Sequence, residues 1–191
     1  MKKNKVSAKG KKTVQKKKTD PAIKRMVDIS VFVLIVLAVT YLVLTFVTQR
    51  TMVKGTSMET TLYSGDNIMI DKLSYRLRDI KRGEIICFRA DSGRDILIKR
   101  VIGLPGETVM INQGSIYIDG EIINDYIGGL SFAGLAENGV TLDGDEYFVL
   151  GDNRRDSIDS RYSEVGCVKR RDILGRAFFL FYPFNRMRIV K

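Results

Sequence analysis

The stretch ILIKRVI, residues 96–102, has the pattern of a β-strand with apolar side chains on both faces. Alternation along a strand puts Leu97, Lys99 and Val101 on one face. The other face carries four residues: Ile96, Ile98, Arg100 and Ile102. Arginine stays charged almost anywhere, but burial can make a lysine neutral. Lys99 is therefore either a strand lysine that reaches out to water, the commoner case, or a buried amine with a chemical role.

Six further runs predict strands, because they alternate apolar and polar residues and are separated by turn residues. They are residues 67–73, 83–90, 107–111, 115–120, 146–152 and 176–183. Asn112-Gln113-Gly114 predicts a hairpin turn, and Asp119-Gly120 predicts a second one. Residues 127–143 predict an irregular surface loop. The fold class we expect is a mainly β domain of small sheets.

The positive charge of the chain is confined to its beginning. Of 32 basic and 22 acidic residues in 191, residues 1–25 hold eleven basic ones and one acid, so 21 of each remain in 26–191. A domain without net charge has no basic face for a phosphate backbone, so we expect no nucleic acid partner. The Lys-rich tail itself predicts a disordered segment that rests on the anionic headgroups of a lipid bilayer.

Residues 29–47, ISVFVLIVLAVTYLVLTFV, contain no charge. As a helix they would span roughly 29 Å, the thickness of a hydrocarbon core. The run is longer than the apolar part of a signal peptide, and no small-x-small site follows it. Because the cations precede the run, the N-terminus should stay in the cytosol. We therefore expect a basic cytosolic tail (1–25), one N-terminal transmembrane helix as an anchor (26–48) and an extracytoplasmic domain (49–191).

The chain has no histidine and two cysteines, which limits its chemistry. Without histidine there is no Ser-His-Asp triad and no Cys-His pair, so a hydrolase would need a carboxylate or a lysine as its base. We expect no metal and no cofactor. Cys87 and Cys167 are consistent either with a disulfide or with two free thiols.

Two other stretches carry candidate chemistry. VKGTSMETTL, residues 53–62, places Ser57 after Gly55, a residue that allows a tight turn. GDNRRDSIDSR, residues 151–161, surrounds Ser157 and Ser160 with charged residues. From composition alone, the first is an ordinary turn and the second is as well explained by a solvated charged loop.

Together with Lys99, these stretches resemble the type I signal peptidases, membrane-anchored serine proteases that remove signal peptides from exported proteins. The matching segments are residues 55–62, 65–66, 99–106 and 151–161, in the family's order. The resemblance covers about residues 27–185 and is nearer to the single-anchor enzymes of Gram-positive bacteria. It implies a bacterial cell membrane location, a single pass, and exported pre-proteins as substrates.

The resemblance implies that Ser57 is the nucleophile and that Lys99, kept neutral by burial, is the general base. It also implies supporting roles for five residues: Ser157, Asp159, Arg161, Asp152 and Arg100. Substrates would carry small residues at −1 and −3. The pocket walls for those two side chains would involve Met58, Val53, Leu62, Leu97, Ile98 and Cys87. If Cys87 lines the −3 pocket, a bridge to Cys167 is not expected.

Two positions depart from the family pattern. Thr60 stands where the family usually has proline, which predicts a less rigid turn after Ser57. Gly55 stands where some members have a serine whose hydroxyl binds the oxyanion, so main-chain donors, chiefly the Ser57 N–H, would carry that role.

Three alternatives remain open. The first is a specialised paralogue with a narrow substrate such as a pilin precursor. The second is a non-catalytic anchored assembly factor, against which the presence of both Ser57 and Lys99 argues. The third is a cytosolic autoprotease of the repressor type, against which the expected anchor and the neutral domain argue.

Overall fold

The computed structural model describes residues 20–46, 48–90, 96–123 and 127–190. The chain divides into two compact units, one ending at Tyr41 and the other beginning at Leu42. The N-terminal helix α1 runs over Pro21–Phe46, so it begins earlier than the expected anchor. Most of the expected basic tail, residues 1–19, lies outside the described residues.

In the part of the chain that the structure describes, we find no helix long and apolar enough to cross a membrane. The structure thus does not confirm the span expected at residues 29–47. Residue 47 lies outside the described residues, and Thr48, which we expected in the anchor, is the first residue of a strand.

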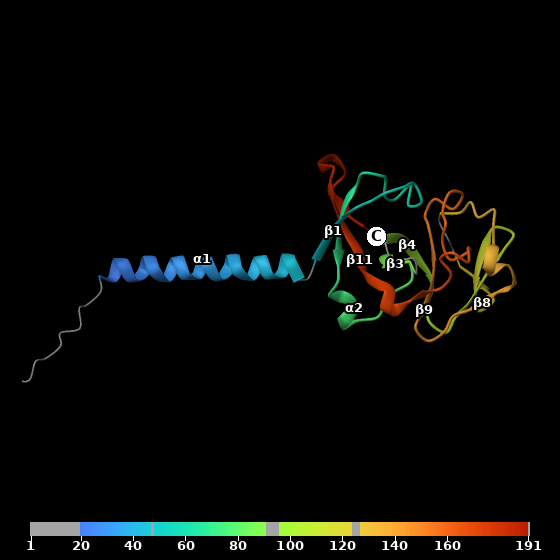
Figure 1. Cartoon of the computed structure of the whole chain (residues 1–191), viewed down its shortest axis with the longest axis horizontal. Coiled ribbons are helices and arrows are strands. Elements are labelled where there is room, and N and C mark those ends of the chain that lie inside the picture. The colour runs from blue at the N-terminus through green and yellow to red at the C-terminus, as the bar shows by residue number, and fades with distance from the viewer. Residues whose placement is uncertain (1–19, 47, 91–95, 124–126, 191) are drawn as a thin grey trace, which may run out of the picture. The chain divides into compact units, whose positions relative to one another are not determined.

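Among the described residues, the larger of two antiparallel sheets has eight strands in the order β1-β2-β11-β3-β4-β9-β10, with β12 paired to β11. Figure 1 labels β1, β11, β3, β4 and β9 of this sheet. Its strands are β1 (Thr48–Met52), β2 (Asn67–Asp71), β3 (Ile85–Arg89), β4 (Ile96–Gly103), β9 (Glu146–Leu150), β10 (Val168–Lys169), β11 (Ile173–Tyr182) and β12 (Arg188–Ile189). The expectation of small sheets was therefore wrong for this sheet, although the mainly β class is confirmed.

The smaller sheet has the order β7-β6-β5-β8. Its strands are β5 (Thr108–Asn112), β6 (Ser115–Ile118), β7 (Glu121–Ile122) and β8 (Val140–Thr141). Asn112 pairs with Ser115 across a two-residue turn, in which Gln113 and Gly114 both have positive φ. This is the geometry that right-twisted hairpins favour, and the predicted hairpin is confirmed.

Short helical elements complete the described fold: α2 (Ser74–Leu77), η1 (Gly134–Asn138), η2 (Arg170–Asp172) and η3 (Phe184–Arg186). The expected irregular loop at 127–143 was wrong in part, because it contains η1 and β8. Leu135 N donates to Arg161 O at 2.9 Å, so this segment is held by a distant part of the chain. The periodicity of the sequence cannot predict a contact between such distant residues.

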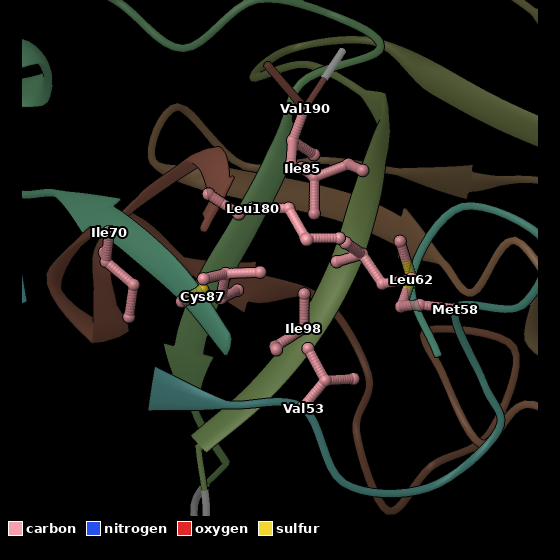
Figure 2. Packing of buried hydrophobic residues seen from close by; sticks show 11 residues of the cluster. Val53, Met58, Leu62, Ile70, Ile85, Cys87, Ile98, Leu180 and Val190 are labelled. Atoms are coloured by element: carbon pink, nitrogen blue, oxygen red, sulfur yellow. The ribbon is translucent and has the colours of Figure 1, made fainter. Parts of the chain in front are cut away.

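The two faces of β4 pack into different hydrophobic clusters, as the alternation of its residues predicts. Ile98, with Ile96 beside it, belongs to the cluster that Figure 2 shows, where Val53 lies beside Ile98. Val101 and Leu97 pack into the cluster on the other face. Lys99 lies between Leu97 and Val101 in this strand and is also buried.

Candidate active site

Lys99 is buried in the middle of β4, with only 3% of its surface exposed. Its amine donates a hydrogen bond of 3.1 Å to Ser157 Oγ. Burial lowers the pKa of Lys99 from 10.5 to about 8, although the carboxylates of Asp159 and Asp152 act in the opposite direction. An amine with this pKa is substantially neutral at mildly alkaline pH and can accept a proton.

Ser57 lies on a turn that follows Gly55, whose φ of 83° is in the left-handed region. A side chain at that φ is strained, which explains the glycine. The loop of residues 151–161 holds this turn through two hydrogen bonds to its main-chain carbonyl oxygens. Asn153 N donates to Ser57 O at 3.0 Å, and Asn153 Nδ2 donates to Thr56 O at 3.3 Å.

A third hydrogen bond links the same two segments. Thr56 Oγ1 donates to Asp156 Oδ2 at 2.6 Å, so the residue before Ser57 is attached by its side chain as well as by its main chain. The nucleophile candidate and the Ser157 loop are therefore fixed relative to each other.

Ser57 and Lys99 line the same cavity, which has a volume of about 240 Å³. The other lining residues are Thr51, Met52, Val53, Lys54, Met58, Ile96, Leu97 and Ile98. Of the predicted pocket residues, four are thus brought to this cavity: Val53, Met58, Leu97 and Ile98. Leu62 and Cys87 are not brought there; both are completely buried in the hydrophobic cluster behind it, together with Met58 and Ile98.

Gly151 lies close to both Ser57 and Ser157. A Cβ at this position would lie 2.5 Å from Ser57 O and closer still to Ser157 Oγ. Both distances are far shorter than van der Waals contact. The absence of a side chain is therefore required for Ser57 and Ser157 to come together.

Asp159 and Arg161 form a buried ion pair. Arg161 Nε donates to Asp159 Oδ1 at 2.8 Å, and Arg161 Nη2 donates to Asp159 Oδ2 at 2.9 Å, so the pair is bidentate. Arg161 Nη2 also donates to Ser157 O at 3.3 Å, and Gly151 N donates to Asp159 Oδ2 at 3.0 Å. The pair braces both Gly151 and Ser157.

A second bidentate pair holds the start of the same loop. Arg100 Nε and Nη2 donate to the two carboxylate oxygens of Asp152 at 2.8 and 2.7 Å. Thr61 Oγ1 donates to Asp152 Oδ2 at 2.5 Å. Because Arg100 follows Lys99 in β4, this pair connects the strand of Lys99, the loop of Ser157 and the turn after Ser57.

Cys87 and Cys167 are free thiols, which settles the alternative that their spacing left open. Burial raises the pKa of Cys87 to about 12 and that of Cys167 to about 11. Both cysteines are therefore protonated and unreactive at neutral pH.

Sequence reasoning missed five residues of this network: Thr56, Thr61, Gly151, Asn153 and Asp156. Gly151 and Asn153 lie inside the charged motif, so their place in GDNR was a usable signal. Thr61 lies in the matching segment 55–62, which was also a usable signal. Thr56 gave no signal, because its partner Asp156 is 100 residues away along the chain.

The chain is similar in sequence to known proteins. Residues 23–182 match the family described as "Signal peptidase, peptidase S26". "Probable signal peptidase I-2" of Synechocystis sp. (strain ATCC 27184 / PCC 6803 / Kazusa) is 41% identical over 153 residues, 76% of this chain and 68% of that protein. "Signal peptidase I T" of Bacillus subtilis (strain 168) is 32% identical over 185 residues, 92% of this chain and 93% of that protein.

A crystal structure of a signal peptidase I from Enterococcus faecalis V583 is also similar, with 31% identity and a TM-score of 0.44. It covers 52% of this chain, and the match takes in 97% of that structure.

The chain belongs to the signal peptidase family, peptidase S26. Its activity is that of signal peptidase I, a serine endopeptidase that cleaves signal peptides from exported proteins. Signal peptidase I is a membrane protein by family. The assignment excludes the non-catalytic assembly factor and the cytosolic autoprotease that the sequence alone left open.

Proposed function

We propose that Ser57 is the nucleophile of this peptidase and that Lys99 is its general base. The observation that carries the proposal is the state of the Lys99 amine, which is buried, has a pKa lowered to about 8 and lines the same cavity as Ser57. One N–H of this amine is engaged by Ser157 Oγ at 3.1 Å. In the neutral form, the lone pair of the amine is then available for the Ser57 hydroxyl.

The reaction is an acyl transfer in two steps. Lys99 takes the proton of Ser57 as the hydroxyl oxygen attacks the scissile carbonyl, and the resulting ammonium then protonates the leaving amine. The signal peptide remains as an ester on Ser57. Lys99, neutral again, removes a proton from water, which hydrolyses the ester and restores the enzyme.

The oxyanion is stabilised by main-chain donors, chiefly the Ser57 N–H. Gly55 has no hydroxyl to offer at the position where some family members carry serine. Because Asn153 fixes the carbonyl groups of Thr56 and Ser57, the turn is held in place before the substrate arrives. Such preorganised donors stabilise a developing charge without having to reorient.

The cavity supports recognition of small side chains at −1 and −3. Its apolar walls include Val53, Met58 and Ile98. Within the described residues, β9 pairs with β4 only from Arg100 onward. Residues 96–99 therefore have a strand edge on which an extended substrate can dock, with alternate side chains directed at the cavity.

We infer that the chain is held at a bacterial cell membrane with its N-terminus in the cytosol and residues 49–191 outside. The inference rests on the family, on the uncharged residues 29–47 and on the cations that precede them. The basic tail would add attraction to anionic headgroups. Protease added to intact spheroplasts would degrade the domain if this topology holds and would leave it intact if the domain is cytosolic.

Cleavage of a signal-peptide-bearing precursor tests the assignment of the two catalytic residues. The purified full chain in detergent should cut after an A-x-A sequence, as mass spectrometry of the products would show, whereas Ser57→Ala and Lys99→Ala should not. Ser163→Ala and Lys81→Ala change an exposed serine and an exposed lysine and serve as matched controls. Normal cleavage by either active-site variant would refute the corresponding role.

The same assay, run on a panel of precursors, addresses the substrate range. A general export enzyme should cut precursors with unrelated mature sequences. A specialised paralogue should cut only one or a few of them.

A further inference from the structure

The segment that leads to Ser57 forms one wall of the substrate cavity and continues the ladder between β1 and β2. Val53 N donates to Asp66 O at 2.8 Å, and Gly65 N donates to Val53 O at 2.9 Å. In an antiparallel ladder, successive residues direct their N–H and C=O groups to opposite edges. The main-chain groups of Lys54 therefore point to the other edge of this segment.

Side chains alternate along the same segment. Val53 is 3% exposed and packs in the hydrophobic cluster with Met58 and Ile98 (Figure 2), whereas Lys54 is exposed to solvent. An extended substrate has the same alternation. If its −1 and −3 side chains enter the apolar cavity on the side of Val53, its −2 side chain points to the side of Lys54.

Lys54 also supplies a positive charge to this cavity. Of the described residues that line it, two are lysines and none is acidic. The second lysine, Lys99, is buried and has its pKa lowered to about 8. None of the ion pairs between described residues includes Lys54.

We propose that Lys54 determines specificity at the −2 position, favouring substrates with an acidic residue there and disfavouring those with a basic one. The proposal rests on the proposed function, since it needs the substrate strand to run through the cavity that contains Ser57. It adds a charge preference at −2 to the preference for small residues at −1 and −3.

The charge preference that we expect at −2 is moderate and depends on the salt concentration. An exposed pair of charges contributes little in water, so we expect a preference of about three- to tenfold in kcat/KM between acidic and basic −2 residues. The Debye length falls from about 10 Å at 0.1 M salt to about 3 Å at 1 M, so the preference should approach unity at high salt.

Three precursors that differ only at −2, with Asp, Gln or Lys there, test the proposal on the full chain in detergent. The unmodified protein should prefer Asp over Gln and Gln over Lys. K54Q should cleave all three alike, and K54E should reverse the order. Lys81 is exposed and does not line the cavity, so K81E makes the same change of net charge and should keep the original order.

Each outcome decides the proposal. The Gln precursor is an internal reference, because a partly folded variant loses activity on all three precursors equally and leaves their ratio unchanged. An unmodified protein without preference, or a K54E protein with the original order, overturns the role of Lys54. A second set of three precursors carries Asp, Gln or Lys only at +1, and a charge preference that depends on Lys54 in this set but not in the −2 set overturns the assignment to −2. Cleavage of the Gln precursor by S57A would instead overturn the proposed function.

Discussion

The amine of Lys99 and the hydroxyl of Ser157 lie 3.1 Å apart and belong to residues separated by 58 positions in the chain. Both side chains are buried, at 3% and 5% exposed. A buried ammonium needs compensation for the hydration it loses, and a single hydroxyl offers little. The contact therefore suits an amine that is neutral for part of the time, oriented by one hydrogen bond and available for another.

The pH dependence of cleavage follows from the Lys99 pKa of about 8, lowered by burial. Only the neutral amine can take the proton of Ser57, so kcat/KM should rise about tenfold per pH unit below pH 8 and level off above it. A profile measured from about pH 5 to 10 checks this. An activity that is constant from pH 6 to 9 would show that Lys99 does not act as the base.

Lys99 should also lower the stability of the folded enzyme. Between pH 8 and 10.5 the unfolded chain binds a proton that the folded chain does not, so stability falls as the pH drops through this range and stays lowered below it. Lys99→Met should therefore be more stable than the unmodified protein at pH 7, by about 3 kcal/mol, with a difference that shrinks toward pH 10.5.

Denaturant unfolding at both pH values measures this difference. Lys81→Met removes an exposed lysine and should change stability little at either pH. If Lys99→Met were less stable than the unmodified protein at pH 7, Lys99 would be contributing favourable interactions as a charged group.

Gly151→Ala should inactivate the enzyme without touching a reacting group. A Cβ at Gly151 would overlap Ser157 Oγ and lie 2.5 Å from Ser57 O, so both segments must move apart. A displacement near 1 Å in an active site typically costs about 10²-fold in rate, and we expect at least that loss in kcat/KM. The assay should be run well below the melting temperature of the variant.

Gly144→Ala is the matched control, because a Cβ there meets no atom within 4 Å. It should retain nearly full activity. Equal activity of the two alanine variants would mean that Ser57 and Ser157 tolerate a wider separation than the structure indicates.

The strands with clear alternation could be predicted from sequence, and so could the hairpin at Gln113-Gly114, because side-chain period and turn chemistry are local properties. β1 could not, since TQRTM is mostly polar and forms a strand only by pairing with β2. β8, β10 and β12 have two residues each, too few for any period to be visible.

For the site, the motifs indicated the two side chains that we propose as reacting groups, Ser57 and Lys99, but not the network that holds them. The bonds from Asn153 to Ser57 and from Thr56 to Asp156 join segments about 100 residues apart, and no spacing rule reports them. The residues that form the pocket walls could also be predicted only in part. Cys87 pairs with Ile98 in adjacent strands, and only the packing separates a residue that lines the cavity from one buried behind it.

Breaking the Asp159–Arg161 pair should destabilise the fold. Arg161→Met leaves a carboxylate buried without its bidentate partner, and losing one member of a buried pair typically costs about 3–5 kcal/mol. The loss of the bond from Arg161 Nη2 to Ser157 O should lower activity as well. Thermal unfolding and the precursor assay measure the two effects. Asp159→Asn combined with Arg161→Met removes the uncompensated charge and should recover part of the stability.

The Arg171–Asp172 pair provides the comparison. Its atoms are 3.9 Å apart and the Arg171 side chain is 74% exposed, so Arg171→Met should change stability by about 0.5 kcal/mol or less. Both variants replace an arginine paired with an aspartate, so the contrast between them measures what burial and bidentate geometry together contribute. If Arg161→Met cost no more than Arg171→Met, the loop of residues 151–161 would be held by its other bonds, chiefly those of Asp152 to Arg100 and Thr61.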